Sequence, residues 1–204
     1  MRSQDDLKAQ LLATLRDLWQ DEQFALNDNA RSEVLRPELL KRLLSVVMTD
    51  DERAAYYGLA EGCRIRESAK IIAPEKLVCG QYVWIGEGAI LDASGGLEIG
   101  HHTTIATGVY VWTHSSVLAN IMDNNQSGNP YIRRQATKIG DGCFIGGPSV
   151  IYPNVTIGNH VVVMPMSVVT EDIPDNVMVA GAPARVVRQI DEAWIKQALS
   201  ALSL

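Results

Sequence analysis

The chain has 204 residues, of which 47% are hydrophobic, so it can bury one substantial core or a core with a small appended piece. Its 18 basic and 24 acidic residues give a formal net charge of −6. This balance excludes a dominant surface for polyanions such as nucleic acid, although it is compatible with a local basic spot.

The first ten residues, MRSQDDLKAQ, carry acid where a secretory signal has a basic start and an apolar stretch. No apolar run approaches the length of a membrane span. We therefore expect a cytoplasmic protein without membrane insertion. Cys63, Cys79 and Cys143 are odd in number and lack C-x-x-C spacing, so they predict reduced thiols rather than a disulfide framework or a zinc knuckle.

Two amphipathic helices are predicted at the start of the chain, because apolar residues recur at helical spacing in residues 5–26 and 33–48. Pro37 is expected in the first turn of the second helix, where its missing N–H costs nothing. Asn29 or Ser32 is the candidate cap of that helix.

A further short helix is predicted after these two. Thr49 and Glu52 stand at the spacing of a capping box, which indicates a helix that runs toward Tyr57. The helical part of the chain is thus expected to end near residue 60.

From about residue 65 the apolar pattern takes a period of six, and internal repeats take precedence over local propensity. With two small phase shifts and one interruption, aliphatic residues mark the repeat at Ile65, Ile71, Leu77, Val83, Ile85, Leu91, Ile99, Ile105, Val111, Val117, Ile139, Ile145, Ile151, Ile157, Val163 and Val169. In the last block a small or β-branched residue follows four positions later, at Cys143, Ser149, Val155, Val161 and Ser167.

This repeat predicts a mainly β fold of triangular coils. Each six-residue unit forms one short strand and a turn, three units complete a coil, and the aliphatic residue points inward. Successive coils stack at roughly 4.8 Å, so like residues form columns. An ordinary sandwich of short strands is disfavoured because its turn signals arrive about every 8 to 12 residues.

The repeat I-G-x-x-x-x, together with VVTEDIPDNVMVAGAPARVVR at residues 168–188, resembles the hexapeptide-repeat acyltransferases, close to the sugar and galactoside O-acetyltransferase branch. The resemblance covers about residues 65–188. It implies a left-handed parallel β-helix, an exception to the usual handedness of parallel crossovers, and a homotrimer that uses acetyl-CoA. The expected organisation is a helical segment at 1–60, a β-helix acyltransferase domain at 61–187 with an extruded loop at 118–137, and a C-terminal helix at 188–204.

The stretch LANIMDNNQSGNPYIRRQAT, residues 118–137, breaks the period, and long loops in compact domains are usually functional. Directly before it stands His114, where the resemblance places the catalytic histidine. Transfer of an acetyl group to a hydroxyl needs a base, and an imidazole suits that task at neutral pH. The alternative is that His114 is a polar residue at a coil corner.

The other histidines raise a rival within the same fold, a γ-type carbonic anhydrase with three imidazoles on zinc. His101 and His102 are adjacent, so they point to opposite sides and do not readily share a metal. No H-x-x-x-x-H pair occurs, and His160 occupies a turn position where exposed polar residues are expected. We therefore predict no metal and no catalytic role for these three residues.

Asp92, in ILDASGGLEIG, stands where sugar O-acetyltransferases often show a comparable aspartate. The resemblance implies that Asp92 binds an acceptor hydroxyl or orients His114. An equally weighted alternative is that its carboxylate satisfies the backbone of the following turn.

The donor site is expected in the last coils, where Gly146 and Gly147 allow close approach of the thin pantetheine arm to the backbone. The resemblance carries CoA contacts onto specific positions of this sequence. These are Gly147, Pro165, Thr170, Arg185 and Arg188, with Ala180 and Gly181 at the adenine end.

Two positions depart from the family pattern. Phe144 stands where the family often has Trp, and Glu171 where it often has Lys, so stacking and phosphate contacts are expected to be weaker or redistributed. For Arg185 and Arg188 the alternative to CoA binding is a solvated start of the C-terminal helix.

Together these features predict an acetyl-CoA-dependent O-acetyltransferase that acts on a hydroxyl of a sugar or polysaccharide precursor. An N-acetyltransferase of an amino-sugar nucleotide, and a serine or xenobiotic acetyltransferase, are alternatives on the same fold, since fold alone does not fix the substrate. An alternative of a different class is a non-catalytic β-helix that serves as an assembly scaffold.

Overall fold

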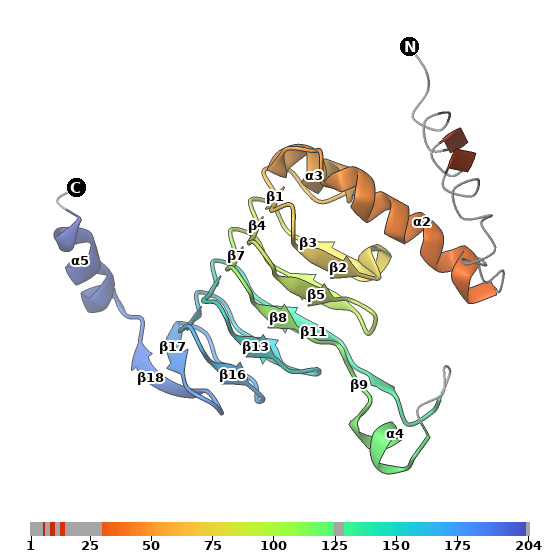
Figure 1. The fold of residues 1–204 in the computed structure, drawn as a ribbon. Coiled ribbons are helices and arrows are strands. Elements are labelled where there is room, and N and C mark those ends of the chain that lie inside the picture. Colours follow the sequence, from red (N-terminus) through yellow and green to blue (C-terminus); the bar gives the residue numbers. More distant parts are fainter. Residues whose placement is uncertain (1–5, 7–8, 11–12, 15–29, 125–128, 203–204) are drawn as a thin grey trace. The chain divides into compact units, whose positions relative to one another are not determined.

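The computed structural model describes residues 6, 9–10, 13–14, 30–124 and 129–202 (Figure 1). The chain forms two compact units, Met1–Leu43 and Leu44–Leu204. The first predicted helix falls almost entirely outside the described residues, and the predicted domain boundaries stay predictions. Within the described residues, no helix is both long and apolar enough to cross a bilayer.

The second predicted helix is present as α2, Ala30–Ser45. The placement of Pro37 in its first turn is wrong, because Pro37 lies inside the helix, well after Ala30. Ser32 is likewise inside α2 and is not its cap. The apolar spacing revealed the helix but not its first turn, because the residues near its start follow no apolar period.

The short third helix is confirmed as α3, Asp50–Tyr56. It starts with the predicted capping box, in which the Thr49 N–H donates to the Glu52 carboxylate over 2.8 Å. Arg53 of α3 is buried, and its guanidinium donates to the backbone carbonyls of Ser45, Met48 and Ile65. The arginine therefore satisfies polar backbone groups where the helical segment meets the first coil of the repeat.

Three parallel sheets form the three sides of the coils. The first contains β1 (Arg64–Ile65), β4 (Trp84–Ile85), β7 (Thr104–Ile105), β12 (Phe144–Ile145), β15 (Val162–Val163), β17 (Val177–Ala180) and the antiparallel β18 (Arg185–Gln189). The second contains β2 (Lys70–Ile72), β5 (Ile90–Asp92), β8 (Tyr110–Val111), β13 (Val150–Ile151) and β16 (Val168–Val169). The third contains β3 (Leu77–Cys79), β6 (Leu97–Ile99), β11 (Thr137–Ile139) and β14 (Thr156–Ile157), and a 3₁₀ turn, η1 (Pro74–Lys76), precedes it.

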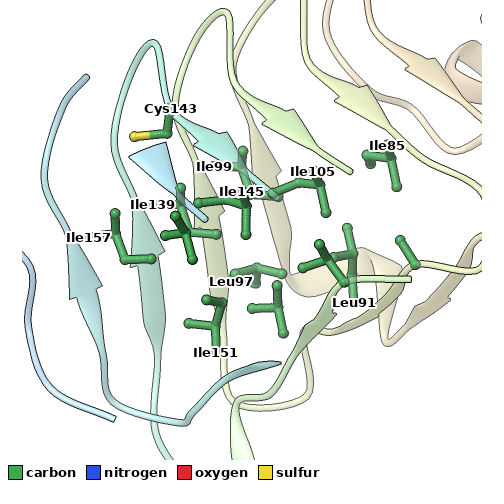
Figure 2. Packing of buried hydrophobic residues seen from close by; sticks show 14 of the residues in the cluster. Ile85, Leu91, Leu97, Ile99, Ile105, Ile139, Cys143, Ile145, Ile151 and Ile157 are labelled. Carbon is green, nitrogen blue, oxygen red and sulfur yellow. The ribbon is translucent and has the colours of Figure 1, made fainter. Parts of the chain in front are cut away.

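The core consists of columns of aliphatic side chains inside the coils (Figure 2). Ile85 pairs with Ile105, and Ile105 with Ile145, in successive parallel registers. All three side chains are fully buried. The predicted columns are thus confirmed, and their stacking removes almost all of this apolar surface from water.

The phase shifts of the repeat have a structural cause at the corner before the third sheet. Leu97 and Ile99 of β6 both face the core, because alternate residues of a strand share a face, and the buried Val155 and Ile157 occupy the equivalent positions in a later coil. Ile71 and Cys79 are eight positions apart, whereas Ile151 and Ile157, at the equivalent positions, are six apart. The corner of the early coils, which holds η1 in the first coil, therefore carries two extra residues that displace the six-residue phase.

An excursion leaves the stack of coils after β8 (Figure 1). It contains β9 (His114–Ser115), the helix α4 (Val117–Ile121) and β10 (Arg133–Arg134), which pairs antiparallel with β9. The assignment of Val117 to the inward column is wrong, because Val117 begins α4 and is 64% exposed. The chain rejoins the coils at β11, where Thr137 pairs with Leu97.

After the last parallel strand, β18 folds back on β17, and the helix α5 (Glu192–Ala201) follows. Asp191 caps α5 by accepting a hydrogen bond from the Trp194 N–H. The pairing of β17 and β18 shifts register between Met178 and Val179, which marks a β-bulge.

Candidate active site

The structure brings His114 and Asp92 together. Asp92 ends β5, His114 begins β9, and the two strands lie on neighbouring coils. The Oδ2 atom of Asp92 lies 2.6 Å from Nδ1 of His114. The carboxylate is fully buried, whereas a third of the His114 side chain is exposed. The imidazole can therefore meet a molecule from solvent while its inner nitrogen stays bound to Asp92.

Backbone and hydroxyl donors hold the Asp92 carboxylate in place. Its Oδ1 accepts from the Ser94 N–H over 3.0 Å, and its Oδ2 accepts from the Thr113 N–H over 2.9 Å and the Thr113 hydroxyl over 3.1 Å. The Thr113 hydroxyl in turn accepts from the Gly95 N–H. Burial raises the pKa of Asp92, but the hydrogen bonds from His114, Thr113 and Ser94 together outweigh burial and lower this pKa to about 2.

The ionised carboxylate sets the tautomer of His114. At neutral pH Asp92 can only accept hydrogen bonds, so Nδ1 of His114 carries the proton. The outer nitrogen, Nε2, is then left with a free lone pair. An imidazole in this form, one third exposed, can take a proton from a hydroxyl group.

The geometry distinguishes three roles of Asp92: binding of an acceptor hydroxyl, orientation of His114, and satisfaction of the backbone of the following turn. Both carboxylate oxygens are engaged inside the protein, and the side chain has no exposed surface. This arrangement favours orientation of His114, combined with the turn-satisfying contact to Ser94, over direct binding of an acceptor.

Two neighbours of His114 escaped the sequence-based prediction. The Trp112 ring meets the imidazole edge to face, with ring centroids 5.9 Å apart, and Tyr110 lies on the other side of Trp112 at 6.4 Å. The alternation of these residues with His114 was the available signal. Arg134 is the cross-strand partner of His114, and no local pattern in the sequence announces this pairing.

The residues predicted for the pantetheine arm lie at one corner of successive coils. Gly147 follows β12, and a Cβ atom built there would lie 1.7 Å from the Thr107 carbonyl oxygen, so only glycine fits. A Cβ atom built at the neighbouring Gly146 would lie 2.9 Å from Cδ of Pro165 in the next coil. The corner therefore combines bare backbone at Gly147 with the exposed ring of Pro165.

Thr170, a predicted CoA contact, and the adenine-end residues Ala180 and Gly181 lie around the end of β16. Thr170 follows β16 directly and is exposed. Val168 of β16 donates its N–H to the Gly181 carbonyl and accepts from the Ala184 N–H. The structure thus places Thr170 beside the turn that follows Ala180.

Arg185 and Arg188 lie in β18, so the alternative that they start the C-terminal helix is wrong. The strand forms because β17 (Val177–Ala180) has one edge that no parallel strand occupies. The chain folds back along that edge and pairs with it antiparallel. Both arginines are exposed, and Nη2 of Arg185 lies 3.4 Å from Oε1 of Glu171. Glu171, which stands where the family often has Lys, therefore partly neutralises the charge of Arg185, a predicted phosphate ligand.

His101 and His102 are engaged elsewhere, and His160 is exposed. Nδ1 of His101 accepts from the Gln81 N–H over 3.1 Å, and the His102 ring stacks on Tyr82 with centroids 5.0 Å apart. His101 borders an open groove of about 780 Å³ along the third sheet. His114 does not line this groove. Within the part of the chain that the structure describes, no three His, Cys, Asp or Glu side chains are grouped to hold a metal ion.

Comparisons with known proteins agree with this fold. The chain is 34% identical over 125 residues to WcaF of Escherichia coli (strain K12), named as a colanic acid biosynthesis acetyltransferase, and the match covers 61% of this chain and 65% of WcaF. It is 50% identical over 54 residues to the galactoside O-acetyltransferase of the same organism, covering 26% and 27% of the two chains. The chain thus spans less than two thirds of either relative.

A solved structure extends the likeness over most of the chain. The hexapeptide-repeat-containing acetyltransferase of Vibrio cholerae O1 biovar eltor, crystallised with acetyl coenzyme A, superimposes with a TM-score of 0.70 at 25% identity, over 87% of this chain and 98% of that one. The left-handed parallel β-helix is thereby confirmed. Residues 136–171 match the family described as bacterial transferase hexapeptide (six repeats). The chain therefore carries the hexapeptide repeat of the bacterial transferases, and its resemblance to the sugar acetyltransferases of that family is confirmed.

Proposed function

We propose that this protein is an acetyl-CoA-dependent O-acetyltransferase that acts on a hydroxyl of a sugar or polysaccharide precursor. The observation that carries the proposal is the contact of 2.6 Å between the buried Asp92 carboxylate and the partly exposed His114 imidazole. The pair stands where the chain leaves the coils, on a fold shared with an acetyltransferase crystallised with acetyl coenzyme A. The sugar acceptor is supported by the names of the two Escherichia coli relatives.

In this mechanism His114 acts as the general base. Its Nε2 takes the proton of the acceptor hydroxyl as the oxygen attacks the thioester carbonyl of acetyl-CoA, and Asp92 stabilises the imidazolium that forms. The tetrahedral intermediate then expels the CoA thiolate, which receives the proton from His114. Each proton is accounted for without a covalent enzyme intermediate.

The donor is proposed to lie along the last coils. The corner at Gly147 and Pro165 gives the pantetheine arm access to backbone N–H groups, Thr170 contacts CoA, and Ala180 and Gly181 border the adenine. Arg185 and Arg188 supply charge-assisted hydrogen bonds to phosphate.

The assembly and location belong to the same proposal. We infer a homotrimer in which each site lies between neighbouring subunits, and a cytoplasmic location. Exposed apolar side chains on the excursion, including the 72% exposed Ile121, support burial against another subunit.

The test is an acceptor screen that follows release of the CoA thiol from acetyl-CoA, with neutral sugars, anionic sugars, amino sugars, serine and chloramphenicol as acceptors. O-acetylated sugar, formed by the wild-type protein and at a much lower rate by His114→Ala, is the expected result. An amine acceptor preferred over every hydroxyl acceptor would favour the N-acetyltransferase alternative. Thiol release no faster than the uncatalysed rate in both proteins would favour the scaffold, and equal release above that rate would remove His114 as the base.

A further inference from the structure

A cationic side chain stands directly beside the proposed base. In the two-stranded ladder of β9 and β10, Arg134 pairs with His114 and Arg133 pairs with Ser115. The Gln135 N–H donates to the Thr113 carbonyl over 2.8 Å, which makes His114 and Arg134 a non-hydrogen-bonded pair. In such pairs the two Cβ atoms are about 4.5–5.5 Å apart and the side chains share a face. Arg134 therefore lies on the face of His114, and Arg133 on the opposite face.

No acidic partner neutralises either guanidinium within the described residues. Both arginines are exposed, and neither forms an ion pair there. Asp92, the carboxylate beside His114, is buried and has both oxygens engaged by Ser94, Thr113 and His114. A free positive charge thus faces the place where the acceptor hydroxyl must lie, in a chain whose net charge is −6.

An apolar surface adjoins His114 along β8. Trp112 meets the imidazole at 5.9 Å, and Tyr110 extends the same row. Aromatic rings give a ligand a flat apolar wall, and a guanidinium binds a carboxylate or phosphate through paired hydrogen bonds. The two neighbours of the base therefore match a ligand that has an apolar face and a negative group.

We propose that Arg134 is a specificity-determining residue that binds a negative group of the acceptor, so that the natural acceptor is an anionic saccharide. Trp112 contacts its ring, and Arg134 binds the carboxylate of a sugar acid or the phosphate of a sugar phosphate. This inference rests on the proposed O-acetyltransferase activity and adds the acceptor class to it.

The experiment compares acetyl transfer to three acceptors of equal ring stereochemistry: a neutral methyl glycoside, the corresponding methyl uronoside with a carboxylate at C6, and the corresponding free sugar phosphorylated at C1. In the wild-type protein one anionic acceptor is expected to have the lowest KM, and this identifies the source of the negative charge. In Arg134→Gln the KM for that acceptor should rise about 10- to 100-fold, while the KM for the neutral glycoside and for acetyl-CoA stays near wild type. Added salt should raise the anionic KM only while Arg134 is present.

Arg133→Gln is the matched control, because it removes the same charge from the adjacent residue on the other face of β10. It should leave all three KM values nearly unchanged. Equal effects of the two substitutions, or an equal effect of Arg134→Gln on neutral and anionic acceptors, would overturn the inference. So would a wild-type enzyme that prefers the neutral glycoside. These outcomes leave the proposed function intact, whereas the absence of transfer to every acceptor contradicts the proposed function itself.

Discussion

At the scale of single residues, the site depends on a carboxylate that cannot reach the solvent. Asp92 is ionised in spite of its burial because three residues, Ser94, Thr113 and His114, direct hydrogen bonds at it. The negative charge of Asp92 thus acts on one partly exposed side chain, the His114 imidazole. A buried partner of this kind fixes both the orientation and the tautomer of a base.

Replacement of His114 by Ala is expected to lower kcat by about 10²- to 10⁴-fold, the usual contribution of a general base. The affinity for CoA should change little, because the donor residues lie on other coils. Steady-state kinetics with direct CoA binding checks both parts. His160→Ala, at an exposed turn, is the matched control and should keep full activity. A fully active His114→Ala enzyme would remove the mechanism.

The lowered pKa of Asp92 predicts an acid-sensitive contribution to stability. A carboxyl group whose pKa falls from 3.8 to about 2 on folding stabilises the folded state fully above its ordinary pKa, and this contribution is lost as the pH falls through about 2. Asp92→Asn should therefore have a lower free energy of unfolding than the wild type near pH 6. The difference should shrink below about pH 4. Denaturant titrations at several pH values measure it, and a difference that grows on acidification would contradict the assigned direction.

Arg185 is expected to bind the 3′-phosphate of CoA. Arg185→Ala should raise the KM for acetyl-CoA and the Kd of CoA, with kcat close to wild type, because this contact is remote from the reacting carbonyl. Binding of dephospho-CoA should hardly change. Glu171→Gln frees the guanidinium from its exposed ion pair and should lower the Kd of CoA by up to about fivefold. Equal weakening toward CoA and dephospho-CoA would show that Arg185 acts structurally.

At the scale of elements, the β-bulge in β18 decides which side chains share a face. Arg185 pairs with Ala180, and Arg188 pairs with Met178, although the two arginines are three residues apart. In a regular strand residues three apart point to opposite faces. The extra residue at the bulge, Val187, brings both guanidinium groups to the outer face of the sheet.

This geometry predicts that the two arginines act on one phosphate group. The double variant Arg185→Ala/Arg188→Ala should lose less CoA affinity than the sum of the single variants, with a coupling of at least about 0.5 kcal/mol. Isothermal titration of CoA against the four proteins gives the coupling. Arg185→Ala combined with Lys70→Ala, in a distant coil, should be additive. Additive losses for the arginine pair would mean that each arginine acts independently.

At the scale of the whole molecule, exposed apolar side chains mark the excursion and the C-terminal helix. Val117 and Ile121 of α4 are 64% and 72% exposed, and Leu199 and Leu202 at the end of α5 are more than half exposed. No residue of α5 is buried within the chain. Such surfaces are usually covered in an oligomer.

We expect a homotrimer of the 22.3 kDa chain. Sedimentation velocity at micromolar concentration should give a single species of three chains, and Ile121→Asp should dissociate it and lower activity. Val78→Asp, at an exposed position of the third sheet, is the control, because it adds the same charge outside the excursion and should leave the trimer intact. A stable monomer with full activity would count decisively against a site shared between subunits.

The sequence predicted the β-helix well because its signal is periodic and each coil repeats the last. The prediction from sequence failed where the six-residue period carries no information. Val117 fits the aliphatic register but starts the helix α4. The position of Pro37 within α2 follows no repeat. His114 was predictable from its place before the excursion. Its partner Arg134 was not, because their pairing spans the whole excursion and depends on a strand register that no local pattern encodes.

The excursion leaves the coils after β8 and returns at Thr137 in the register that the preceding coil dictates. The stack of coils is therefore continuous across this insertion, and the length and composition of the inserted segment are free to vary without disturbing the core. Recombination or drift confined to residues 115–136 would exchange the neighbours of His114, Arg134 among them, while the donor corner at Gly147 stays unchanged. A lineage built on this scaffold can thus acquire a new acceptor in a single genetic event and keep its acyl donor.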